Sequence, residues 1–378
     1  MIRALSKAIC AIGAALLLVG CDVPTGGPRI GQGPVQVALL VPSNSEDVRV
    51  NNLADTLIAA ANMAIEESGT DSVRLTIFPT QGTVEGARAA AQQALAAKAR
   101  VIVGPLYADN AVTVGQVVAG AGLPVLSFSN NPQIAGGNVY ALGQSFEDTA
   151  TRLIAYANNQ GRSRVLAIVP DGAAGDVAAN AVSNAAASIG VTYAGKATYP
   201  FSQEGVQRSA RDIVVQVNST GSDIAILSAN PAGALPLLAQ SLGEAGFDTS
   251  RSLVSGLARW DVPASTLSLI TLQNGIFALP NIAASTNFAN RFEAFAGIPP
   301  QLVTGVSYDA MTVVAGQLVA GGSSPFSQEQ LTSRTFSGAS GSFRLTPSGQ
   351  ARRELAIARV SEDSYEIVSQ TQITEVGL

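Results

Sequence analysis

The residues that most enzymes use for acid–base and nucleophilic chemistry are scarce in this sequence. Its 378 residues include no histidine, which excludes Ser-His-Asp and Cys-His catalysis and removes the commonest protein ligand of transition metals. None of the three lysines follows a serine by three positions, so a Ser-x-x-Lys acyl-enzyme is also excluded. Acid pairs such as Glu46-Asp47 suggest glycoside hydrolysis, but a single tryptophan argues against a groove for stacking sugars. We therefore expect a binding protein rather than an enzyme, with no cofactor and no metal.

Side chains suited to ligand binding follow the ends of the predicted strands. The carboxyl ends of parallel strands meet at one edge of a sheet, where ligands of α/β proteins bind. Arg259 offers a bidentate fork for a carboxylate. Trp260 is either a platform for a ring or apolar group or a packing residue, and the sequence leaves both open. The candidate ligand or partner site consists of Tyr107, Asp109, Ser127, Ser129, Asn130, Asp171, Arg259 and Trp260.

Strands and helices alternate along most of the chain. Val35–Val41 is a continuous β-branched and Leu run, typical of a strand buried on both faces, and a helix is expected over 52–67. Similar pairs follow in two series that separate near residue 145. This order predicts an α/β fold with two parallel sheets, each covered by helices on both faces. Three further strands expected after residue 340 are too few for a domain and should complete these sheets.

The N-terminus carries a secretion signal. A short basic segment with Arg3 and Lys7 precedes the apolar run 8–19, which is too short to span a membrane. Leu18-Val19-Gly20-Cys21 resembles the lipobox of bacterial lipoproteins, which implies removal of residues 1–20 and lipidation of Cys21; the alternative is an ordinary signal peptide with a chance cysteine. Residues 21–34 form a Gly/Pro-rich tether. We expect a periplasmic protein anchored to the inner or outer membrane.

The charge balance argues against nucleic acid as a partner. The 22 basic and 27 acidic residues give a net charge of −5, and the basic residues are scattered.

Several short segments together resemble the type I periplasmic binding proteins, the leucine/isoleucine/valine-binding class. Each segment is weak alone, but their shared order from Val35 onward is specific. The resemblance implies two Rossmann-like lobes joined by three crossover strands, with lobe 1 formed by 35–145 plus about 281–325 and lobe 2 by 146–280 plus about 326–378. The matching segments are Val101–Leu106, Gly122–Ser127, Arg164–Val169, Asp223–Leu227, Tyr308–Ala310 and Ser340–Gly349.

The expected cleft departs from that of amino-acid-binding members. The Gly104-Pro105 loop lacks a hydroxyl cluster, no aromatic residue precedes Gly175, and Arg259 stands where an α-ammonium group would need an acid. An α-ammonium buried without a carboxylate would be uncompensated. The cleft is therefore expected to suit a small polar ligand with amide or hydroxyl groups.

Two stretches resemble a particular branch of this fold, the penicillin-binding-protein activator lipoproteins. These stretches are Ser127–Pro132 and Val139–Ala150, and the expected lipid anchor agrees with them. This resemblance implies a non-enzymatic regulator whose partner is a peptidoglycan synthase. The alternative is a receptor that delivers a small polar solute to an ABC permease.

The lipobox gives a first prediction. Replacing Cys21 with Ser should release the protein into the soluble periplasmic fraction, because no lipid can be added without the cysteine thiol. Fractionation followed by mass spectrometry of the N-terminus measures this. A variant that stays in the membrane with residues 1–20 still attached would contradict the lipoprotein assignment.

Overall fold

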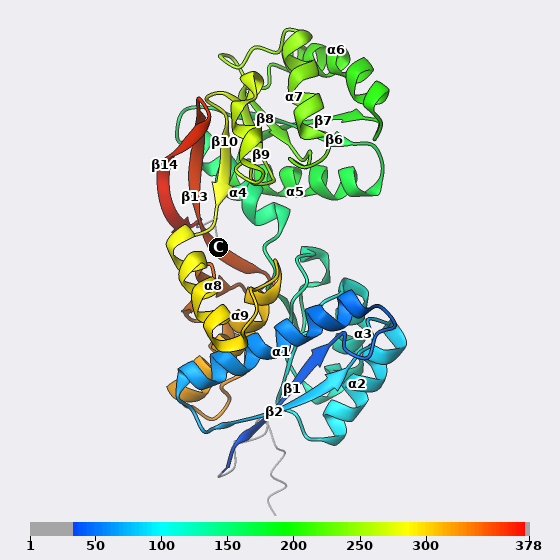
Figure 1. The fold of residues 1–378 in the computed structure, drawn as a ribbon, viewed down its shortest axis with the longest axis vertical. Coiled ribbons are helices and arrows are strands. Elements are labelled where there is room, and N and C mark those ends of the chain that lie inside the picture. Colours follow the sequence, from blue (N-terminus) through cyan, green and yellow to red (C-terminus); the bar gives the residue numbers. More distant parts are fainter. Residues whose placement is uncertain (1–32, 375–378) are drawn as a thin grey trace, which may run out of the picture.

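Two α/β lobes make up residues 33–374, which are the residues described by the computed structural model (Figure 1). The expected signal peptide, Cys21 and most of the expected tether lie outside the described residues. The fold class expected from the sequence is confirmed, with one lobe built on a parallel sheet and the other on a mixed sheet.

Lobe 1 contains a five-stranded parallel sheet in the order β2-β1-β3-β4-β5. Its interior strand β1 is almost entirely buried, as its continuous apolar sequence requires. The fifth strand, β5, has only three residues and was not expected. The strands are β1 (Val35–Val41), β2 (Val73–Pro79), β3 (Val101–Val103), β4 (Val125–Ser127) and β5 (Val139–Ala141).

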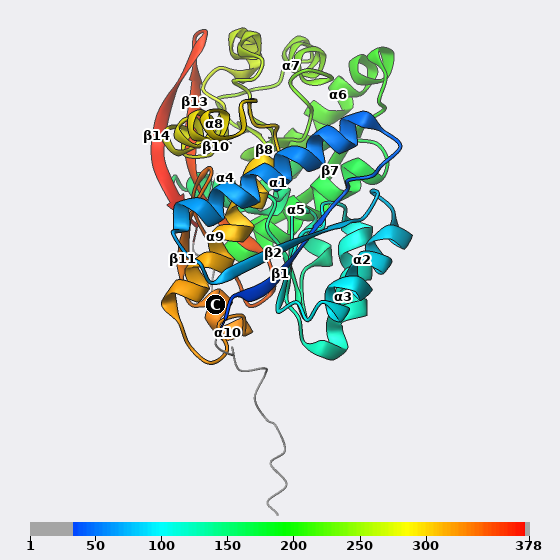
Figure 2. The same ribbon diagram turned by 60° about the horizontal axis from the view of Figure 1, so that its bottom comes forward.

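Helices cover both faces of this sheet. Helices α2 (Val84–Ala96) and α3 (Ala108–Val118) pack on one face, and α1 (Val48–Ser68) packs on the other beside α9 (Thr304–Ala320) (Figure 2). Helix α1 begins four residues before its predicted start, because the Asp47 side chain accepts a hydrogen bond from the Arg49 backbone N–H and caps the helix.

Lobe 2 is built around β6 in the same manner. Helices α4 (Phe146–Asn158) and α5 (Ala173–Ile189) pack on one face of its sheet, and α6 (Gln203–Thr220) and α7 (Leu235–Glu244) pack on the other. Its parallel strands are β7 (Thr192–Tyr199), β6 (Arg164–Pro170), β8 (Ile224–Leu227), β9 (Leu253–Gly256) and β10 (Ile276–Leu279).

The C-terminal strands complete this sheet, as expected, but they make it mixed. Strand β13 (Ala351–Ser361) runs antiparallel to β10 and pairs on its other side with β14 (Ser364–Ile373). The first residues of β13 pair with β12 (Gly341–Leu345), which pairs with β11 (Thr335–Gly338). Strand β13 therefore reaches from one lobe into the other.

The segment between β10 and β13 packs on lobe 1. It contains α8 (Ile282–Ala296), α9, α10 (Gln328–Thr332), β11 and β12. Leu331, Phe336 and Phe343 lie in the same buried cluster as β1 and α1. The expected boundary near residue 325 therefore falls too early, because core packing changes lobe only where β13 begins.

Buried charges join the lobes where the chain crosses between them. Arg353 of β13 donates one hydrogen bond to Asp309 of α9 (2.6 Å) and another to the Leu142 carbonyl in the β5–α4 crossover (2.7 Å). Its backbone N–H donates to Asp148 in the first turn of α4 (3.0 Å). Arg352 contacts Asp148 and Glu147, each at 3.5 Å. We call Glu147, Asp148, Asp309, Arg352 and Arg353 the hinge cluster.

The hinge cluster gives a prediction on stability. Arg353→Met should lower the free energy of unfolding by about 3–5 kcal/mol, since it leaves the buried Asp309 carboxylate without its cation. Urea unfolding followed by circular dichroism measures the loss. Arg208→Met is the matched control, because Arg208 forms only an exposed pair with Glu204 and should leave the midpoint nearly unchanged. Equal midpoints for the two variants would contradict the role assigned to Arg353.

Candidate functional site

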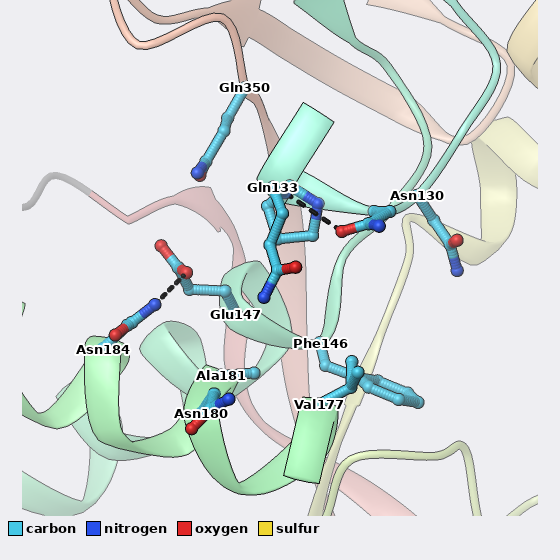
Figure 3. A pocket seen from close by; sticks show the side chains of 11 residues that line it. Asn130, Gln133, Phe146, Glu147, Val177, Asn180, Ala181, Asn184 and Gln350 are labelled. Atoms are coloured by element: carbon cyan, nitrogen blue, oxygen red, sulfur yellow. Dashed lines mark hydrogen bonds between the residues drawn. The ribbon is translucent and has the colours of Figure 1, made fainter. Parts of the chain in front are cut away.

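A cavity of about 410 Å³ lies between the two lobes (Figure 3). This volume is within the usual range for small-molecule sites. Lobe 1 and the end of the β12–β13 connection form one wall, and the first turn of α4 together with α5 forms the other. The lining residues are Asn130, Asn131, Pro132, Gln133, Phe146, Glu147, Val177, Asn180, Ala181, Asn184 and Gln350.

The lobe 1 wall is a short turn after β4. The Asn131 side chain accepts a hydrogen bond from the Gln133 backbone N–H (3.0 Å), and Pro132 occupies the first position of a 3₁₀ turn over Pro132–Ile134. Gly143 lies so close behind this turn that a Cβ there would be 2.7 Å from the Asn130 backbone nitrogen. The turn is thereby held against the first crossover, with Gln133 directed toward α5 (Figure 3).

Glu147 enters the cavity from the first turn of α4. Ser145 caps this helix by accepting a hydrogen bond from the Asp148 backbone N–H, which leaves Glu147 facing α5. Asn184 donates a hydrogen bond to Glu147 Oε2 (3.0 Å), and Arg352 lies 3.5 Å from Oε1. Glu147 is thus both a cavity residue and a member of the hinge cluster.

Helix α5 presents one face to the cavity. Val177, Asn180 and Asn184 are spaced so that they lie on one side of the helix. The helix approaches β6 closely at Gly175, where a Cβ would lie 1.7 Å from the Pro170 carbonyl oxygen. Any larger residue at 175 would displace α5 and with it this wall of the cavity.

The lining is rich in side-chain amides. The amide groups of Asn130, Gln133, Asn180 and Gln350 form no hydrogen bond with another residue in the part of the chain that the structure describes. Each amide offers both a donor and an acceptor. Apolar contact comes from Phe146 and Val177, which are 41% and 47% exposed. The site can therefore hold a ligand by several neutral hydrogen bonds and one apolar contact.

The buried hinge acid next to Glu147 is electrostatically perturbed. Burial raises the pKa of the Asp148 carboxyl, and the neighbouring Arg352 and Arg353 only partly oppose this shift.

Of the lobe 1 residues predicted for the site, only Asn130 lines the cavity. Tyr107 and Asp109 are exposed at the start of α3. Ser127 and Ser129 are buried: the Ser127 hydroxyl donates to the Pro105 carbonyl (2.9 Å), and Ser129 Oγ accepts from the Asn131 backbone N–H. The two serines thus hold the turn that carries Asn130.

The lobe 2 residues predicted for the site lie elsewhere. Asp171 is exposed after β6. Both sides of the Arg259 fork donate to Asp261, at 3.0 and 2.6 Å, and this hydrogen bonding raises the pKa of Arg259. Trp260 is fully buried, stacked over Gly256 and 5.8 Å from the Phe277 ring. Of the two roles left open for Trp260, packing is the one it has here.

The remaining cavity residues were not predicted. Four of them lie in the two stretches that resemble the activator lipoproteins, namely Asn131, Pro132, Phe146 and Glu147. The spacing of Val177, Asn180 and Asn184 could have indicated an exposed helix face, which signals a surface but not a site. No local sequence pattern marks Gln350, because it lies more than 160 residues after the other cavity residues in the chain and only the fold brings it to them.

Residues 33–374 contain neither a candidate membrane-spanning helix nor a candidate metal site. No helix there is long and apolar enough to cross a membrane. No group of three or more acidic or thiol side chains there could hold a metal ion.

Two α/β lobes, three crossovers and a cavity between the lobes define a bilobal ligand-binding protein. The chain belongs to the periplasmic binding protein family, which it matches over residues 34–365. Proteins of this family bind substrates rather than transform them, and membership implies a periplasmic location.

Known structures agree on the fold. A branched-chain amino acid ABC transporter periplasmic ligand-binding protein from Burkholderia xenovorans is 19% identical, with a TM-score of 0.65 over 90% of this chain and 96% of its own. An ABC transporter substrate-binding protein from Desulfitobacterium hafniense, in complex with Leu, is 18% identical, with a TM-score of 0.59 over 89% and 100%. An uncharacterised protein from Rickettsia prowazekii is 22% identical over 66% of this chain and 68% of its own.

The burial of Trp260 can be tested directly, because it is the chain's single tryptophan. Its fluorescence should be shifted to short wavelength and should resist quenching by acrylamide, since the ring has no exposed surface. Urea-unfolded protein is the control and should be quenched freely. Equal quenching of the folded and unfolded protein would place Trp260 in an open cleft instead.

Proposed function

We propose that this protein is the substrate-binding component for an ABC permease and captures a small polar solute between its lobes. The observation that carries this proposal is that one cavity is lined by residues from both lobes, so a ligand would contact both at once. A ligand that binds both walls favours whichever lobe arrangement brings them together, by its differential affinity alone. The similar transporter proteins support the same function.

A second function rests on a different observation. The stretches that resemble penicillin-binding-protein activators, Ser127–Pro132 and Val139–Ala150, supply Asn130, Phe146 and Glu147 to the cavity. A membrane-anchored regulator of a peptidoglycan synthase, held by lipid on Cys21, would use the same cleft to contact its partner. Capture of a purified penicillin-binding protein by the anchored protein, in the absence of any solute, would favour this second function.

Blocking the cavity tests the main proposal. Asn180 is exposed on α5, so Asn180→Trp should fold normally while its indole fills the space between the lobes. Small-angle scattering across a broad solute library should show a smaller radius of gyration for the parent protein with at least one solute. The Asn180→Trp variant should show no such change.

The matched control is Gln92→Trp, since Gln92 is exposed on α2 and away from the cavity lining. This control should close as the parent does. Closure of Asn180→Trp with the same solute and affinity as the parent would contradict the proposed site.

A further inference from the structure

We propose that the cavity selects uncharged ligands bearing neighbouring donor and acceptor groups, and rejects ligands with a free carboxylate. This inference rests on the proposed function and specifies the solute class for the same cavity. Its basis is the chemistry of the lining, which combines several amides with one acid and includes no lysine or arginine among its described residues.

The side-chain amides determine which ligand groups the cavity attracts. Four side-chain amides each bring a free donor and a free acceptor to one space of about 410 Å³. They are Asn130 and Gln133 from lobe 1, Asn180 from α5, and Gln350 from the end of the β12–β13 connection. Pairs of this kind match neighbouring hydroxyls or amides, which also present a donor beside an acceptor. The two possible sources, a polyhydroxylated compound and a compound with carboxamide groups, share this chemistry.

Glu147 determines which ligand groups the cavity repels. It is the only acid in the lining, and its side chain is 13% exposed. A ligand carboxylate would be held near this acid with only amide N–H groups to receive it, while Arg352 lies behind Glu147 and also contacts Asp148. Removing a carboxylate from water without a cation is unfavourable, so an α-amino acid should bind less well than its amide.

The test compares ligands that differ only at this group. Isothermal titration calorimetry on the whole chain would use N-acetyl-L-leucine against N-acetyl-L-leucinamide, and methyl glucuronoside against methyl glucoside. The neutral member of at least one pair should bind ten or more times more tightly than the acid. Which pair binds identifies the source as amide or polyol.

Two variants assign this preference to named residues. Asn180→Ala should lower the affinity for the neutral ligand by about 2- to 10-fold, which is the range for one neutral hydrogen bond. Glu147→Gln should narrow the gap between the neutral and acidic members by about fivefold or more, because it removes the repelling charge while keeping an oxygen for Asn184. Gln92→Ala and Glu244→Gln, both on exposed helix positions outside the cavity, should change neither quantity.

The outcomes separate the two proposals. If N-acetyl-L-leucine or methyl glucuronoside binds as tightly as its neutral partner and closes the lobes, the ligand class is wrong while the substrate-binding function stands. If the preference exists but Glu147→Gln leaves it unchanged, the assignment to Glu147 is wrong. If no solute of either class or of the wider library closes the protein, the substrate-binding function and the ligand class both fall.

Discussion

One buried arginine, Arg353, holds the two lobes and the first crossover together. Arg353 donates to Asp309 of lobe 1, to the Leu142 carbonyl of the first crossover, and through its backbone to Asp148 of lobe 2. Asp309 in turn accepts from the Ala339 backbone N–H, which ties β11 to the same point. A buried charge that loses its partner is far more costly than one on the surface, so these contacts persist together or fail together. The crossovers are thereby held at one place, and the walls of the cavity are arranged around it.

The cavity and the hinge cluster meet at the first turn of α4. Glu147 faces the cavity and Asp148 faces the interior, and Arg352 contacts both. Burial disfavours the charged form of Asp148 and raises its pKa, while the charges of Arg352 and Arg353 oppose this shift. Under the proposed function, a ligand group that contacts Glu147 would act on a residue that shares Arg352 with the hinge cluster. Ligand binding and lobe orientation would then be linked through this one side chain.

The fold was predictable where burial dictates sequence, and less so where tertiary pairing decides. Val35–Val41 reads as a strand because both its faces are covered, whereas β5 and β10, with three and four residues, are too short to show a period. Strand-end reasoning selected Asn130, which lines the cavity. It failed for Trp260, because a loop at a strand end can fold back into the core as readily as it can face a cleft. Gln350 reaches the site through the pairing of β12 with β13 and through its own bridge to Ala141 of β5, which no local pattern encodes.

If the lobes open and close on a ligand, as proposed, an amide-rich lining suits that motion. In the open state the walls are wet, and each group on them must be stripped of water when the lobes meet. Amides lose less than charges on desolvation, and a ligand with matched donors and acceptors replaces the lost water bonds one for one. An empty cleft gains nothing from closing, because its amides would then face one another without complete pairing. Under the proposed function, the lining that favours a neutral ligand would also favour the open state of the unliganded protein, so that closure would report occupancy.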